Sequence, residues 1–127
     1  MIVVDTSALM AILLEEALAQ SCIEAIALAD RISISASKFA EAMIVAQRRT
    51  LADEMRRVIV EGEFEVVTLD EKAAARAADA YRLWGKGFHP ARLNYGDCFA
   101  YELARRLDCP LLYIGSDFSQ TDIAAAL

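Results

Sequence analysis

The chain has 127 residues, of which 57% are hydrophobic, and a formal net charge of −6. This length predicts a single domain spanning residues 1–127, with a core of ordinary size. The longest apolar run covers residues 8–14 and is far shorter than the roughly 20 residues of a bilayer span, so we expect no membrane segment. Because no cleavable leader and no metal-type cysteine spacing are visible, we expect a cytoplasmic protein with reduced cysteines.

The net negative charge does not by itself exclude a nucleic-acid partner. An acidic protein generally repels the phosphate backbone of nucleic acid. Five of the 19 acidic residues, however, lie where metal ligands are expected, and the remaining acids nearly balance the 13 basic residues. Net charge therefore argues neither for nor against a nucleic-acid partner.

The first half of the chain alternates short β-branched segments with helical patterns. Buried strands are expected over residues 2–4 and 32–36. An apolar stripe at three-four spacing follows the second strand, as expected of a helix that covers a sheet. The helices expected in this half cover residues 7–14, 16–30, 37–49 and 51–61, the last one capped by Gly62.

The second half continues the alternation. An alanine-rich helix is expected to begin with a capping box between Thr68 and Glu71, and Asn94 is expected to cap a later helix. A segment with two glycines and a proline separates these helices as a loop. The expected elements are a strand over residues 64–69, a helix to about 84, a loop over 85–93, a helix to about 107 and a strand over 111–114.

Strands that alternate with helices predict an α/β fold, here a three-layer α/β/α domain. Its central sheet is expected to be mainly parallel and covered by helices on both faces. The carboxyl ends of parallel strands lie along one edge of the sheet, where ligands bind in such folds. Side chains at these strand ends are therefore the first candidates for a functional site.

Acidic side chains follow the predicted strands at this edge. Asp5 closes the first strand, Asp117 closes the last, and Asp122 follows soon after. Glu41 lies about one turn into the helix after the second strand, and Asp97 lies in the first turn of the last predicted helix. Crowded carboxylates repel one another, and a divalent cation relieves that repulsion. Oxygen ligands without cysteine or histidine favour Mg²⁺ or Mn²⁺ over Zn²⁺.

Some of these acids also have a purely structural explanation. Asp97 can stabilise a helix N-terminus, and Asp117, with Gln120 three residues later, can be an N-cap. Glu41 borders an apolar helix face and Asp5 follows a buried strand, where an unpaired carboxylate is costly. Metal binding therefore explains Asp5 and Glu41 better than capping does.

Other polar candidates carry less weight. His89, the only histidine, lies in the predicted loop and is interpreted as a surface residue. Three arginine pairs, at 48–49, 56–57 and 105–106, are interpreted as solvated helix faces, although their charge would suit phosphate. The aromatic residues of the second half are interpreted as core or interface rather than as a platform for stacking bases.

Four segments carry the acids in a recognisable order. They are Val3-Val4-Asp5-Thr6-Ser7-Ala8, Phe39-Ala40-Glu41-Ala42, Asn94-Tyr95-Gly96-Asp97-Cys98-Phe99-Ala100-Tyr101 and Ser116-Asp117-Phe118-Ser119-Gln120-Thr121-Asp122-Ile123. Together they resemble the PIN domain, and specifically the VapC toxins of bacterial toxin–antitoxin pairs. Length, order and spacing agree over essentially the whole chain, and the last two segments are the most specific.

The resemblance implies an endoribonuclease that hydrolyses RNA phosphodiester bonds with Mg²⁺ or Mn²⁺. The implied catalytic residues are Asp5, Glu41, Asp97 and Asp117, of which Asp5, Asp97 and Asp117 are the expected metal ligands. The implied supporting residues are Ser7, Thr121 and Asp122. The number of acids permits either one or two metal ions. The resemblance further implies a homodimer and a small antitoxin protein, whose C-terminal segment covers the acidic groove, often with an arginine.

One position departs from the pattern. Many relatives carry a lysine just before the glycine that follows the last strand, whereas Ile114 precedes Gly115 here. Two alternatives to a nuclease therefore remain open. The first is a catalytically silent PIN-like module that binds an antitoxin or operator DNA. The second is a phospho-acceptor receiver or an aspartate phosphatase, although Ser7 stands where such a phosphatase has its second aspartate.

Overall fold

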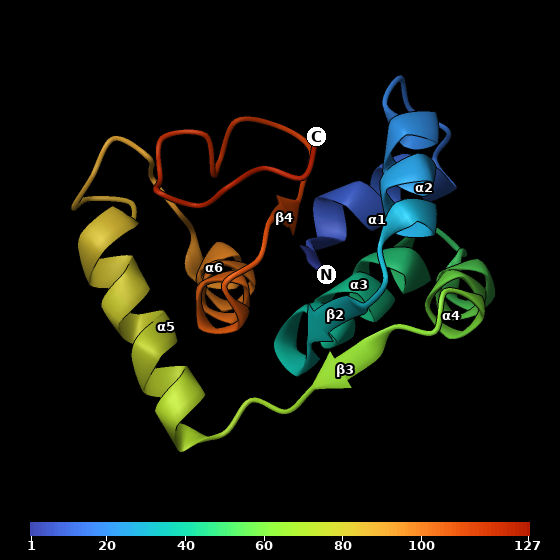
Figure 1. Cartoon of the computed structure of the whole chain (residues 1–127). Coiled ribbons are helices and arrows are strands. Elements are labelled where there is room, and N and C mark those ends of the chain that lie inside the picture. The colour runs from blue at the N-terminus through green and yellow to red at the C-terminus, as the bar shows by residue number, and fades with distance from the viewer.

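The computed structural model describes all 127 residues and contains four strands and six helices (Figure 1). The four strands form one sheet in the order β3-β2-β1-β4, and every neighbouring pair is parallel. The strands are β1 (Ile2–Val4), β2 (Ile32–Ser35), β3 (Glu65–Val67) and β4 (Leu111–Leu112). The helices are α1 (Thr6–Leu13), α2 (Ala19–Leu28), α3 (Ala36–Arg48), α4 (Ala52–Glu61), α5 (Glu71–Trp84) and α6 (Tyr95–Leu107). The predicted three-layer α/β/α fold with a parallel sheet is confirmed.

Strand β1 lies in the middle of the sheet and divides the core in two. Successive side chains of a strand point to opposite faces, so Val3 packs with residues of α5 and α6, whereas Ile2 and Val4 pack with residues of α1 to α4. Figure 1 shows the same division, with α5 and α6 on one side of the strands and α1 to α4 on the other. Because both of their faces are covered, β1 and β4 are entirely apolar, whereas β2 alternates isoleucine with serine and β3 is largely exposed.

Helix α6 is the most deeply buried helix. Its residues from Asp97 to Ala104 are all buried, because it packs against α5, α3 and three of the strands. Among them is Glu102, a buried carboxylate whose oxygens accept hydrogen bonds from Arg76 of α5 and Arg106 of α6. The first turn of α6 is therefore held in a fixed position relative to the sheet.

Helix boundaries differ from the predicted ones at two places. The predicted capping box between Thr68 and Glu71 is wrong: Asp70 caps α5, and its side chain accepts a hydrogen bond from the Ala73 N–H at 2.8 Å. Thr68 remains in the extended connection after β3. Gly62 does follow α4 but keeps a right-handed conformation, and Glu63 takes the left-handed one.

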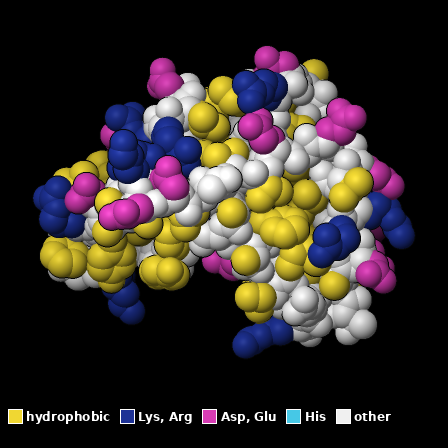
Figure 2. Space-filling model, turned by 90° about the horizontal axis from the view of Figure 1, so that it is seen from below, with side chains coloured by type: hydrophobic (Ala, Val, Ile, Leu, Met, Phe, Trp, Pro, Cys, Tyr) yellow, Lys and Arg dark blue, Asp and Glu magenta, His cyan; other side chains and the backbone are white.

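The C-terminal segment after β4 contains no helix and lies along the edge of the sheet (Figure 1). It is held by buried Phe118 and by a bridge between Ala125 and Leu111 of β4. Seen from below, the molecule is hollowed between the side that carries α5 and the opposite side (Figure 2). None of the helices has the length and apolar character needed to cross a bilayer.

Candidate functional site

Asp5 and Ser7 connect the ends of the neighbouring strands β1 and β4. Asp5 caps α1, and its Oδ2 accepts hydrogen bonds from the Ser7 N–H at 3.1 Å and from the Ser7 hydroxyl at 2.6 Å. The Ser7 hydroxyl oxygen in turn accepts the Ile114 N–H at 3.0 Å, just beyond β4. Ser7 therefore fixes the Asp5 carboxylate and joins the end of β1 to the segment that carries Asp117.

Lys38, which the sequence analysis did not single out, lies buried beside these acids. Only 2% of its side chain is exposed, and its Nζ lies 3.1 Å from Asp5 Oδ1 and 2.8 Å from Glu41 Oε1. Burial alone would lower the pKa of Lys38, but the two carboxylates outweigh that effect and raise it above its ordinary value. The ammonium is therefore charged at neutral pH. The spacing of three residues between Lys38 and Glu41 was the available signal, because such pairs meet on a helix.

Glu41 reaches from α3 to the start of α6, where Gly96 makes room for it. Its side chain is 39% exposed. A Cβ atom on Gly96 would collide with Glu41 Oε2, so only glycine at this position leaves the carboxylate where it is. A glycine within a helix costs about 1 kcal/mol relative to alanine. That cost was the sequence signal for a special role of Gly96.

Asp97 combines the two roles between which the sequence analysis could not decide. It completes a capping box: Asp97 Oδ2 accepts the Asn94 N–H at 3.0 Å, and Asn94 Oδ1 accepts the Asp97 N–H at 2.8 Å. It also faces the other acids. Burial, reinforced by the negative charges of Asp5 and Asp117, raises the pKa of Asp97 to about 6, although the Asn94 hydrogen bond opposes this. Asp97 follows Gly96, which lies beside Glu41 and Lys38, so the start of α6 lies at the edge of the sheet where Asp5 is held.

Asp117 is exposed and lies in the turn that follows β4. The N-cap explanation for it is wrong, because no helix begins there. The turn is anchored by its neighbour Phe118, which is buried in the α5–α6 side of the core. Asp117 is therefore free to bind a ligand without giving up an internal contact.

Asp122 and Thr121 lie in a different environment from the other acids. The Tyr101 hydroxyl of α6 donates a hydrogen bond to Asp122 Oδ1 at 2.6 Å, and Arg105 lies 3.9 Å from the other oxygen. Burial and the Asp122 contact raise the pKa of Tyr101 to about 12. Thr121 donates its hydroxyl to the Phe118 carbonyl at 2.7 Å. In this arrangement both residues hold the C-terminal segment in place.

The donor set fits a hard divalent cation. All the candidate ligands are carboxylate oxygens, and buried Asp5 Oδ1 has no hydrogen-bond partner although Lys38 lies 3.1 Å away. The pKa of Asp97 is raised mainly by burial and further by the charges of Asp5 and Asp117. As the side chains stand, no three of them are arranged to hold an ion together.

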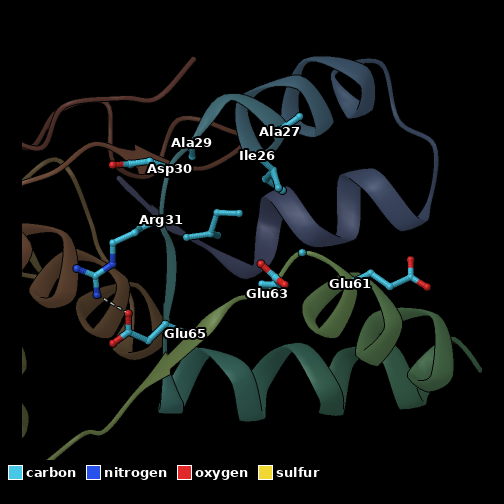
Figure 3. Close-up of a pocket in the computed structure, with 10 residues that line it drawn as sticks. Ile26, Ala27, Ala29, Asp30, Arg31, Glu61, Glu63 and Glu65 are labelled. Carbon is cyan, nitrogen blue, oxygen red and sulfur yellow. Dashed lines mark hydrogen bonds and ion pairs between the residues drawn. The ribbon is translucent and has the colours of Figure 1, made fainter.

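Two cavities of the molecule lie away from these acids. One, of about 380 Å³, lies beside the residues that precede β2 and β3, which is the opposite edge of the sheet. Figure 3 shows that Arg31 in this cavity is paired with Glu65, at 2.6 Å. The other cavity, of about 590 Å³, lies between α5 and α6 and has no acidic residue in its lining. His89 packs its ring against Trp84 in the loop and adds nothing to the acidic cluster.

Comparisons with known proteins identify the family of the chain. The profile of the PIN domain family matches residues 2–124. Ribonuclease VapC42 of Mycobacterium tuberculosis is 40% identical over 128 residues, covering 98% of each chain. Ribonuclease VapC30 of the same organism is 44% identical over 130 residues, covering 96% of this chain and 95% of its own.

Solved structures show the same fold. Mycobacterium tuberculosis VapC20, described as a toxin that cleaves the sarcin-ricin loop, superimposes with a TM-score of 0.77 at 17% identity, covering 98% of this chain and 97% of its own. A toxin–antitoxin complex from Klebsiella pneumoniae contains a chain that superimposes with a TM-score of 0.75 at 17% identity, covering 96% of this chain and 93% of its own. With the family profile and the full-length relatives, these findings show that the chain belongs to the PIN domain family and, within it, to the VapC ribonucleases.

Proposed function

We propose that this protein is a divalent-metal-dependent endoribonuclease that acts as the toxin of a toxin–antitoxin pair. The proposal is supported by the placement of Asp5 and Asp117 after the neighbouring strands β1 and β4, at the edge of the sheet to which the start of α6 brings Asp97. The relatives at 40–44% identity are named ribonucleases over nearly their full length, which supports the same activity here.

Asp5, Asp97 and Asp117 are the residues that would hold the metal, with Mg²⁺ as the expected ion and Mn²⁺ as a substitute. When bound, a divalent ion supplies a water of lowered pKa and a positive charge beside the scissile phosphate. Ser7 orients Asp5 through two hydrogen bonds. Glu41, with part of its carboxylate exposed, is in a position to accept a hydrogen bond from the attacking water while Lys38 holds its other oxygen.

The same site suggests the binding partners of the protein. RNA is the substrate class, and a small antitoxin protein with a cationic side chain would neutralise the exposed carboxylate of Asp117. The net charge of −6 favours association with a basic segment of this kind. We further propose a homodimer in the cytoplasm, where the RNA is found. A catalytically silent module is the second candidate, because Ile114 stands where many relatives have lysine.

A cleavage assay separates these candidates. Purified protein freed of antitoxin is incubated with total cellular RNA in Mg²⁺, in Mn²⁺ and in EDTA, with Asp5→Asn alongside. Discrete fragments that require metal and disappear with Asp5→Asn are the expected result. Folded protein that cleaves nothing in either metal would favour the silent module, and cleavage that persists with Asp5→Asn would remove Asp5 from the site.

A further inference from the structure

Lys38 is the only buried lysine of the three in this chain. Lys72 and Lys86 are exposed, whereas the Lys38 side chain is enclosed where β2 passes into α3. Burying an ammonium group is costly unless opposite charges surround it. Its two partners are Asp5 and Glu41, both acids of the proposed nuclease site. The chain therefore places a permanent cation inside a site that would otherwise hold carboxylates alone.

The position of the ammonium is defined by three elements. Its Nζ lies 3.1 Å from the Asp5 carboxylate at the end of β1 and 2.8 Å from the Glu41 carboxylate in α3. It also lies 3.5 Å from the position that a Cβ on Gly96 would take at the start of α6. A second cation could not enter the space between the Asp5 and Glu41 carboxylates without displacing the ammonium. Asp97 and Asp117, in contrast, have no cationic partner of their own in the structure.

We propose that the Lys38 ammonium takes the place of a second metal ion, so that the site binds one divalent ion through Asp5, Asp97 and Asp117. This inference rests on the proposed nuclease function and decides between the one-ion and two-ion forms that the acids alone permit. Together, four carboxylates, one divalent ion and one ammonium carry a single net negative charge. Without the ammonium two would remain, which favours the entry of a second ion.

Lys38 also acts as a positioning residue for Glu41. It holds Glu41 Oε1, while Gly96 leaves space for Oε2, so the carboxylate keeps one orientation although its side chain is partly exposed. An ammonium has one fixed location and cannot dissociate, so the site depends on a single metal-binding step.

The test is a count of bound Mn²⁺ in the absence of RNA. Free Mn²⁺ is measured by electron paramagnetic resonance while wild-type protein, Lys38→Met, Lys38→Gln and the exposed control Lys72→Met are titrated. Wild type and Lys72→Met are expected to bind one ion per chain. Lys38→Met and Lys38→Gln are expected to bind a second ion at least about tenfold more tightly than wild type. Lys38→Arg retains the charge and is expected to bind one.

The wild-type count tests the inference even where a Lys38 variant fails to fold. Two ions per wild-type chain, or a single ion with unchanged affinity in folded Lys38→Gln, would overturn it. Two ions together with metal-dependent RNA cleavage would leave the nuclease function standing. One bound ion per chain without any RNA cleavage would contradict the nuclease function but agree with the inferred ion count. No bound Mn²⁺ at all would overturn both the nuclease function and the ion count.

Discussion

Asp5 and Asp97 each perform a structural task in addition to facing the site. Asp5 caps α1, and Asp97 closes the capping box of α6. Replacing such a cap by alanine typically costs about 1 kcal/mol of stability. An alanine variant would therefore confuse loss of chemistry with loss of folding. Asparagine keeps an oxygen that can accept the same hydrogen bond, and exposed Asp117 offers a position where no internal contact is lost.

The stability of the metal-free protein is expected to depend on pH through Asp97. The carboxyl of Asp97 has a pKa near 6 in the folded chain against an ordinary value of 3.8. Between these values the folded state binds more protons than the unfolded state, so stability falls as pH rises. The free energy of unfolding of wild type should therefore fall relative to that of Asp97→Asn as the pH rises from 4 to 7. Urea unfolding in EDTA measures it, and a difference that is flat with pH would contradict the raised pKa.

Gly96→Ala is expected to separate activity from stability. The added Cβ would collide with Glu41 Oε2, which is the end of a flexible side chain, so the carboxylate can move away at small energetic cost. Alanine also favours the helix by about 1 kcal/mol. We therefore expect unchanged or slightly higher thermal stability with RNA cleavage reduced at least about tenfold. Full activity in this variant would show that the position of Glu41 does not matter.

The sequence pointed to candidate acids for the site but not to what lies between them. Asp5, Asp97 and Asp117 could be found because each follows a strand end or a helix start. Lys38 and Gly96 could not be recognised as site residues from the sequence, because the role of each depends on how closely α3 approaches α6. Asp122 has the same residue type and a neighbouring position, yet its contact with Tyr101 comes from the packing of the C-terminal segment on α6.

At the scale of elements, helix α6 depends on the buried carboxylate of Glu102. Arg76 joins it to α5, and Arg106 holds it from within α6. Both arginines are partly exposed, so either can be hydrated when the carboxylate is lost. The pairing therefore matters most as a link between α5 and α6.

Glu102→Ala is expected to lower the free energy of unfolding by about 1–3 kcal/mol, since buried hydrogen bonds to charged groups are lost. Arg76→Ala is expected to cost less, because Arg106 still satisfies Glu102. Urea unfolding of both variants at pH 7 measures these costs. Equal losses in the two variants would show that Arg106 alone does not satisfy Glu102, and no loss in either would show that the network contributes little.

Element types were predictable from the sequence, whereas several boundaries were not. Helix α5 begins at Asp70 rather than Thr68 because the chain stays extended for two residues beyond β3. Helix α2 begins later than predicted, at Ala19, after a turn in which Glu15 has a positive φ. These boundaries depend on how far each strand must extend before its helix can pack on the sheet, which no local pattern records.

At the scale of the whole molecule, the parallel sheet brings the site together. Acids that are far apart in the chain meet because β1 and β4 are neighbours and end at the same edge. That topology followed from the alternation of strands and helices in the sequence. The position of the C-terminal segment did not, because it is set by Phe118 and Asp122 contacts rather than by an element of its own.

The central claim is that the carboxylates at this edge carry out metal-dependent RNA cleavage. The most direct measurement compares the rate of cleavage of one defined RNA fragment by wild type, Asp117→Asn and the exposed control Asp53→Asn across a Mg²⁺ titration. Asp117 and Asp53 are both exposed, so neither variant should alter folding. We expect Asp53→Asn to match wild type and Asp117→Asn to lose at least about a hundredfold in rate at every Mg²⁺ concentration. Equal rates for all three proteins would contradict the account.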